Sequence, residues 1–172
     1  MGDWGWLGAP PADVACGVSG GGGPDADFPP SNLPYGIFSA PGDQRGRRRL
    51  GVAVGGQVLD LAALSAGGLL CGPHLGGAAG RAALGSTSLN AFMALGPDAW
   101  REAREVLTRL LRGSEGGLRD DARLRAAALH DRAAVSLHLP AEVGDYTDFN
   151  ACRWHAANVG AIFRRVPRAR GR

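Results

Sequence analysis

The first pattern along the chain is a set of short runs in which apolar residues alternate with small or polar ones. There are four of these runs, at residues 35–39, 50–54, 57–61 and 133–139. Such runs are typical of strands with one buried face. Gly55 and Gly56 separate the second run from the third, and a two-residue glycine loop between strands predicts a hairpin. We therefore expect a small antiparallel sheet or barrel, whose last strand is closed by Pro140.

A helical period replaces this alternation after residue 97. Five apolar residues of the segment 98–112 share one face of a helix: Trp100, Ala103, Leu107, Leu110 and Leu111. Pro97 occupies a favoured first helical position, and Gly113 is placed where a glycine often ends a helix. One amphipathic helix is predicted over residues 98–112.

Weaker signals flank this helix. The segment 67–85 is rich in glycine and alanine and has little periodicity, which predicts a loop. Serine and aspartate are favoured helix caps, and two such pairs precede short apolar segments. They are Ser86 or Ser88 before a helix through Met93, and Asp120 or Asp121 before a helix through Ala128.

Charge is distributed unevenly over the 172 residues. All 19 basic residues are arginines, and the formal net charge is +3. Residues 1–163 hold 14 of these arginines and all 16 acidic residues, whereas residues 164–172 hold five arginines and no acid. A nucleic-acid-binding surface usually combines basic and aromatic residues on the folded part of a protein. Because the basicity here belongs to the end of the chain, we expect no nucleic-acid partner.

The sequence predicts neither a membrane span nor a targeting segment. No apolar run approaches the roughly 20 residues that cross a bilayer, and the first residues lack the features of a signal or transit peptide. Cys16, Cys71 and Cys152 are far apart, which argues against a disulfide framework or a structural zinc site. We expect a cytoplasmic protein with reduced thiols and no membrane partner.

The segment after residue 140 carries the candidate chemistry. Asp145 and Asp148 are carboxylates of the kind that bind Ca²⁺ or Mg²⁺. His155 follows seven residues after Asp148, and a neutral imidazole can act as a general base near pH 7. The spacing by itself is a weak signal for a metal-assisted hydrolytic site.

Structural roles for the same residues remain open at this level. Either aspartate can cap a helix that begins near Asn150, because Asp is a favoured cap. If that helix continues to residue 163, His155 shares a face with three apolar residues, namely Val159, Ile162 and Phe163. A histidine in such a stripe is more often a hydrogen-bonded core residue than a catalytic one.

Six segments occur in the order and roughly the spacing of one known family. They are residues 27–39 (DFPPSNLPYGIFS), 89–96 (LNAFMALG), 118–121 (LRDD), 138–140 (HLP), 144–149 (GDYTDF) and 155–160 (HAANVG). Through them the chain resembles fumarylacetoacetase from residue 27 to about residue 165. Several motifs in register are far more specific than any one of them.

The resemblance implies a fold that is mainly β with helices, of the α+β class. A small SH3-like, partly open barrel with accompanying helices is expected over residues 27–140. A truncated start of a catalytic domain is expected over residues 141–165. We predict a disordered leader at residues 1–26 and an Arg-rich tail at residues 166–172. The family also implies a homodimer.

The same resemblance implies hydrolysis of 4-fumarylacetoacetate to fumarate and acetoacetate, the final step of tyrosine catabolism. Asp148 matches a metal ligand of the family, which uses Ca²⁺ and Mg²⁺, and His155 matches the general base. Arg164 matches a substrate-binding arginine, which suits a small-molecule dicarboxylate because a guanidinium can bind a carboxylate bidentately. Asp145 and Tyr146 belong to the motif, with structural roles.

Two departures from the family pattern bear on activity. Asn150 stands where the family has a substrate-binding tyrosine, so it is a weaker substrate-binding candidate. The remaining acidic ligands of the family lie beyond residue 172, so the complete metal site is not present in this chain. We expect a chain that is inactive alone. The alternative is a non-catalytic interaction module that docks onto a full-length homologue.

Overall fold

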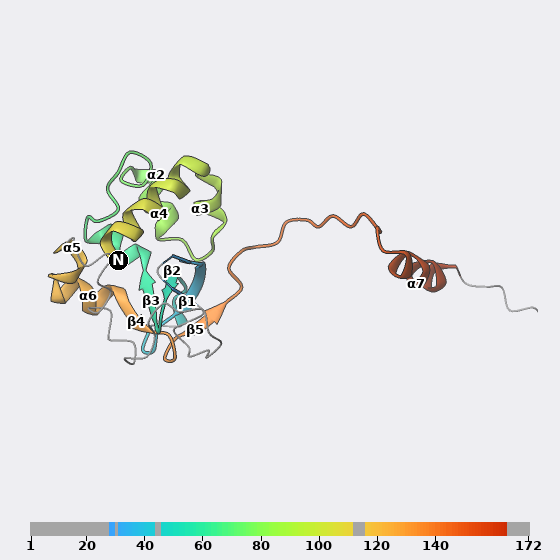
Figure 1. Cartoon of the computed structure of the whole chain (residues 1–172), viewed down its shortest axis with the longest axis horizontal. Helices are drawn as coiled ribbons and strands as arrows, with labels where there is room; N and C mark the ends of the chain where they lie inside the picture. The colour runs from blue at the N-terminus through green and yellow to red at the C-terminus, as the bar shows by residue number, and fades with distance from the viewer. Residues whose placement is uncertain (1–27, 30, 44–45, 112–115, 165–172) are drawn as a thin grey trace, which may run out of the picture. The chain divides into compact units, whose positions relative to one another are not determined.

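The computed structural model describes residues 28–29, 31–43, 46–111 and 116–164 (Figure 1). The chain divides into two units, of which the first reaches Glu142 and the second begins at Val143. The predicted leader at residues 1–26, the predicted helix end at Gly113 and the predicted tail at residues 166–172 lie outside the described residues.

Within the described residues, the first unit contains a sheet of five strands. They are β1 (Tyr35–Ser39), β2 (Arg49–Val54), β3 (Gln57–Asp60), β4 (Leu129–Asp131) and β5 (Ser136–His138). Their order is β4-β3-β2-β1-β5, and every neighbouring pair is antiparallel. The predicted hairpin is confirmed, because Val54 pairs with Gln57 and Gly55 adopts a positive φ of 55° between them.

The sheet curls into a half-barrel. Its edge strands β4 and β5 are consecutive in the chain and are joined only by residues 132–135. The edges of a flat five-stranded sheet would lie about 19 Å apart, whereas a fully extended connection of this length reaches only about 17 Å. Phe38 of β1 and His130 of β4 show the curl directly, since their ring centroids are 5.3 Å apart although β2 and β3 separate the two strands.

Two strand predictions need correction. Of the run at residues 133–139, only Ser136–His138 is a strand, because the chain turns before it and the Ala134 N–H donates to the Asp131 carbonyl (3.0 Å). The sequence did not predict β4. This three-residue strand has no usable periodicity of its own and forms by pairing with β3, where Val58 lies opposite His130.

Helices hold more of the described residues than strands do, so the expectation of a mainly β fold is too strong and the fold is a mixed one. The helices are α1 (Leu61–Ala66), α2 (Ala78–Leu84), α3 (Asn90–Ala94), α4 (Pro97–Leu111), α5 (Gly116–Arg119), α6 (Ala122–Ala128) and α7 (Arg153–Phe163). The long amphipathic helix is confirmed as α4. The cap prediction for α6 is confirmed at Asp121, whose side chain accepts from the Leu124 N–H (2.8 Å).

Predictions from local sequence patterns were wrong at two helices. The predicted loop at residues 67–85 contains α2, whose Ala83 and Leu84 are buried. Alanine gives little periodic signal, so tertiary packing decides this segment. Neither predicted serine caps α3: its cap position is Leu89, without a side-chain cap bond, and the Ser86 hydroxyl accepts instead from the Ser88 N–H.

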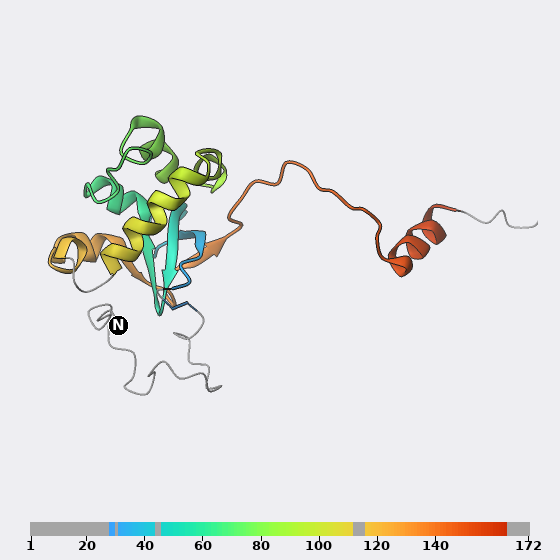
Figure 2. The ribbon, with the colours of Figure 1, turned by 45° about the horizontal axis from the view of Figure 1, so that its top comes forward.

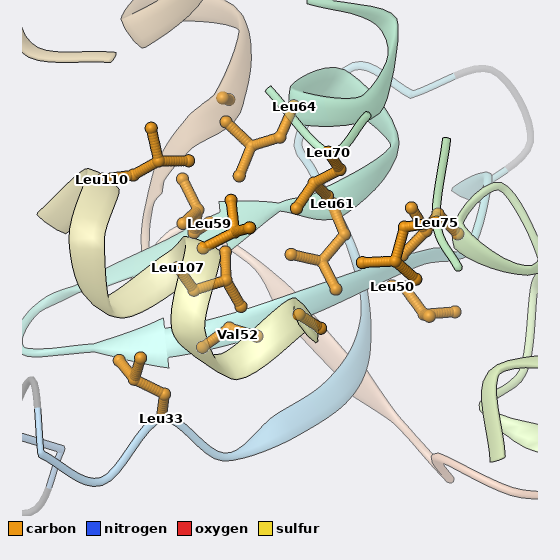
Figure 3. Packing of buried hydrophobic residues seen from close by; sticks show 14 of the residues in the cluster. Leu33, Leu50, Val52, Leu59, Leu61, Leu64, Leu70, Leu75, Leu107 and Leu110 are labelled. Atoms are coloured by element: carbon orange, nitrogen blue, oxygen red, sulfur yellow. The ribbon is translucent and has the colours of Figure 1, made fainter. Parts of the chain in front are cut away.

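The main core lies between the helices and one face of the sheet. Helix α4 crosses this face (Figure 2). Leu107 and Leu110 of α4 lie close to Leu59 of β3 (Figure 3), and Leu107 is fully buried. The expected helix face is confirmed except at Trp100, which is 40% exposed and donates its Nε1–H to the Phe92 carbonyl (3.0 Å).

A polar cluster occupies the opposite, inner side of the half-barrel. Asp60 is 1% exposed and accepts from an Arg49 guanidinium N–H at 2.7 Å, while a second N–H of Arg49 donates to Asp43. The guanidinium lies 5.4 Å from the Phe38 ring centroid. The Nε2 atom of His130 is buried 4.0 Å from an Asp60 carboxylate oxygen and has no hydrogen-bond partner among the described residues. Side chains from four chain segments thereby meet in this cluster.

Candidate functional site

The candidate site lies in the second unit, around the start of α7. This helix begins at Arg153, three residues later than the start predicted near Asn150, and its cap position is Cys152. No side-chain bond caps it, so the possibility that Asp145 or Asp148 caps the helix is wrong. The side chain of Asp148 instead makes hydrogen-bonding contacts with Asn150 and His155.

Asp148 and His155 are brought together by a turn. One Asp148 carboxylate oxygen, Oδ2, lies 2.9 Å from Nε2 of His155. The other oxygen, Oδ1, accepts from the backbone N–H of Asn150 at 2.8 Å. Both residues that the sequence placed at the centre of the site are therefore in direct contact within this unit.

The contact is open to solvent. The side chains of His155 and Asp148 are 49% and 48% exposed, so His155 is not the buried core histidine that its apolar stripe also suggested. The pKa of the Asp148 carboxyl lies below its usual value, chiefly because the Asn150 N–H donates to it and further because His155 lies beside it. Asp148 is thus held as an acceptor for the imidazole.

The two substrate-binding candidates occupy different places. Asn150 is in the turn itself, and its backbone φ of 49° is the only positive value among the described residues other than glycine. Arg164 is the C-terminal cap residue of α7, and its N–H donates to the Gly160 carbonyl (2.9 Å). Arg164 follows His155 by nine positions, which corresponds to a rise of about 13 Å along the helix axis. The structure therefore does not gather Arg164 with the pair.

The described residues do not make a complete metal site. Among them, no group of three or more His, Cys, Asp or Glu side chains is arranged to hold an ion. Asp148 is a suitable donor, but one carboxylate is far short of the 6 to 8 oxygens that Ca²⁺ takes, and both of its oxygens already accept other contacts. A metal would need further donors.

The sequence analysis did not predict the backbone hydrogen bond from Asn150 to Asp148 in this site. The Asp-Phe-Asn order at residues 148–150 is compatible with a turn in which an aspartate accepts from the N–H two residues on, because Asp and Asn both favour such turns. That local signal could have been found. The polar cluster of Asp43, Arg49, Asp60 and His130 could not, since it is complete only when β4, which the sequence does not predict, pairs with β3 and brings His130 to Asp60.

The second unit presents an unusual amount of apolar side chain to solvent. Described residues 143–164 include Phe149, Trp154 and Phe163, which are 87%, 72% and 81% exposed, and α7 has no buried residue. The apolar side of α7 predicted from the sequence is therefore not covered by the other described residues of the second unit.

Comparison with known proteins identifies the class. Residues 31–140 match the family described as "Fumarylacetoacetase N-terminal". The matched region lies within the first unit, and Asp148 and His155 follow it in the sequence. The chain belongs to the fumarylacetoacetase family, as its motifs predicted.

Similar curated proteins come from animals and plants. Fumarylacetoacetase of Homo sapiens is 49% identical over 140 residues, and that of Bos taurus is 48% identical over the same length. Each match covers 81% of this chain and 32% of the relative. Fumarylacetoacetase of Arabidopsis thaliana is 42% identical over 142 residues, with 83% and 32% covered. The chain therefore matches about a third of the length of these relatives.

No helix among the described residues is long and apolar enough to cross a membrane. The longest, α4, has 15 residues and several charged ones.

Proposed function

We propose that this chain supplies the N-terminal domain and the general base of a fumarylacetoacetase, which hydrolyses 4-fumarylacetoacetate to fumarate and acetoacetate in tyrosine catabolism. The observation that carries the proposal is the 2.9 Å contact between His155 and Asp148, found in a chain of this family. The N-terminal domain is proposed to be an SH3-like barrel, which the half-barrel sheet supports.

His155 is exposed enough to reach a water molecule, and its ring is oriented by Asp148. Its Nε2 faces the Asp148 carboxylate, which fixes the ring and leaves Nδ1 as the nitrogen that can take a proton from water. The resulting hydroxide adds to a carbonyl carbon of the substrate. The carbon–carbon bond then breaks, and its electron pair leaves with the acetoacetate fragment as an enolate. That enolate takes up the proton that His155 removed from water, and the new carboxyl group of fumarate releases its proton to solvent.

The remaining parts of the proposed site must come from further residues. Asp148 is proposed as one ligand of a divalent ion, Ca²⁺ or Mg²⁺, and Arg164 as a guanidinium that binds a substrate carboxylate. The described residues do not complete either subsite, so no step is assigned to the metal. We propose a cytoplasmic protein that, as a family member, pairs with a second copy.

The first test uses the chain as it is. Purified protein is mixed with 4-fumarylacetoacetate, Ca²⁺ and Mg²⁺, and the loss of the diketone absorbance is followed. We expect no turnover, because one carboxylate cannot hold the ion. Turnover at the rate of a complete fumarylacetoacetase would show that residues 1–172 are sufficient and would overturn this part of the proposal.

The second test asks whether His155 and Asp148 work in a complete site. Residues 1–164 are joined to the remaining part of the human enzyme, and His155→Ala and Asp148→Ala are compared with the unchanged fusion. Each should lower kcat by about 10²-fold or more, the range that a general base contributes. His74→Ala is the matched control, because His74 is an exposed histidine of the first unit. Equal activity of H155A and H74A would refute the assignment.

A docking module without catalysis is the competing function. The exposed apolar side chains of residues 143–164 fit a surface that packs against the rest of a catalytic domain as well as one that binds a separate protein. No observation favours the second case, so the enzymatic proposal stands as the better one.

A further inference from the structure

We infer that Asn150 acts as a positioning residue through its backbone: its left-handed conformation folds Asp148 back onto His155. This assigns Asn150 a role other than the substrate contact expected from its place in the motif. The catalytic meaning of the role rests on the proposed function of the pair, but the conformational claim does not.

The chain between the two partners must reverse for them to meet. Seven residues separate Asp148 from His155, and seven extended residues would span about 23 Å. His155 is the third residue of α7, whereas residues 148–152 precede the helix, so the reversal has to occur before Arg153. The observed separation of 2.9 Å therefore requires a sharp turn between Asp148 and the helix.

Asn150 is where the backbone departs from ordinary geometry. Its φ of 49° lies in the left-handed region, which side chains other than those of asparagine and aspartate enter at a cost. The same residue donates its backbone N–H to Oδ1 of Asp148, which aims Oδ2 at the imidazole. One residue thus sets both the direction of the chain and the orientation of the carboxylate.

The residue type fits this role. Asparagine tolerates left-handed backbone better than any residue except glycine, and a large side chain such as tyrosine tolerates it less well. The N–H bond to Asp148 is a backbone bond, so it does not need the amide side chain. A glycine at position 150 should preserve the turn, and alanine or tyrosine should weaken it.

The test compares three variants of the full chain, Asn150→Gly, Asn150→Ala and Asn150→Tyr, with the parent by NMR. The readouts are the nuclear Overhauser effect between the His155 ring protons and the Asp148 β-protons, and the HN–Hα coupling of residue 150, which reports φ. We expect N150G to keep the ring contact. N150A and N150Y should reduce its population about fivefold or more, as the cost of a left-handed residue implies.

Controls separate this effect from unfolding. The amide spectrum of residues 31–111 reports whether the first unit stays folded in each variant, and Asp148→Ala gives the signal of a lost contact. The inference is overturned if N150A and N150Y retain the parent's contact, if N150G loses it, or if the parent lacks the contact. Loss in N150A and N150Y with retention in N150G supports it.

The fusion enzyme distinguishes positioning from substrate binding. If Asn150 positions the pair, N150A should have a kcat about fivefold below that of N150G, with a smaller difference in KM between the two variants. A rise in KM shared by N150G and N150A would assign the side chain to substrate binding and overturn the inference. A fusion that is inactive with the parent sequence would count against the proposed function, and the NMR comparison would still decide the conformational claim.

Discussion

Different interactions stabilise the two units of the chain internally. The first unit buries a continuous set of side chains, mostly of leucine, valine and alanine, between its helices and its half-barrel sheet. The second, described at residues 143–164, has no buried helix residue and is organised by three short-range hydrogen-bonding groups, Asp148, Asn150 and His155. The fold thus resides in one unit, and the candidate chemistry in the other.

Because of this difference, the two units should respond differently to substitutions. In the first unit, a side chain matters through the contacts that surround it on every side. In the second, a side chain matters through one hydrogen bond or through its helix propensity, because nothing packs over it in the described residues. Substitutions of the same type should therefore have opposite consequences in the two units.

The largest effect is expected from a core leucine. Leu107→Ala removes a fully buried side chain from α4 and should lower the free energy of unfolding by about 3 kcal/mol, through lost burial and the cavity left behind. Ile162→Ala is the matched control, because Ile162 is 72% exposed on α7. Urea unfolding of both variants measures the difference. A loss in I162A as large as that in L107A would abolish the distinction between the units.

A glycine of the sheet provides the next largest effect. A Cβ on Gly51 would lie 2.7 Å from side-chain atoms of Phe38 and Val58, so Gly51→Ala should destabilise the first unit by about 1–3 kcal/mol. Gly36 lies directly opposite on β1, and a Cβ there meets nothing within 4 Å. Gly36→Ala should leave the urea midpoint nearly unchanged. Equal shifts in the two variants would mean that the inner side of the half-barrel is not closely packed.

The same contrast decides what the sequence could predict. Helix α4 and the turn at Gly55 follow from local rules of periodicity and glycine placement, and both are confirmed. Helix α2 and strand β4 were missed because their formation depends on partners distant in sequence, which a local pattern does not contain. The buried contact of Arg49 with Asp60 was missed although both residues belong to the hairpin of β2 and β3, because strand alternation does not show which polar side chains meet across it.

Prediction of the candidate site from the sequence is limited in a different way. The resemblance to the family points to Asp148 and His155, whereas their spacing alone is also compatible with helix capping and with a buried histidine. The contact between them depends on the left-handed backbone of Asn150, a feature that the sequence permits but does not specify. A family pattern gives the residues, and the turn gives their geometry.

Low pH should destabilise the first unit through His130, a response that distinguishes it from the second unit. Burial, and then the neighbouring Arg49, hold the pKa of His130 below its usual value of 6.5, although Asp60 and Asp43 raise it. Because the unfolded chain then takes up the proton more readily, this contribution to stability is complete above pH 6.5 and is lost as pH falls toward the folded pKa. Asp43, whose pKa Arg49 lowers, adds a further loss below 3.8.

Urea midpoints of the first unit, measured from about pH 7.5 to about pH 5.5, test the His130 part. They should fall with pH in the parent and fall less in His130→Gln. His155→Gln is the control from the second unit and should follow the parent. A midpoint in H130Q that falls as steeply as the parent's would assign the acid sensitivity to other groups.

The smallest effect, with the opposite sign, is expected in α7. A Cβ on Gly160 meets nothing within 4 Å, and the helix buries none of its side chains, so its helicity depends on intrinsic propensity. Gly160→Ala should stabilise α7 by about 0.5–1 kcal/mol, because alanine loses less backbone entropy than glycine. Carbon chemical shifts of residues 153–163 should move toward helical values while the urea midpoint of the first unit stays unchanged. A loss of helicity in G160A would show that Gly160 faces a close neighbour, and the second unit would then be packed like the first.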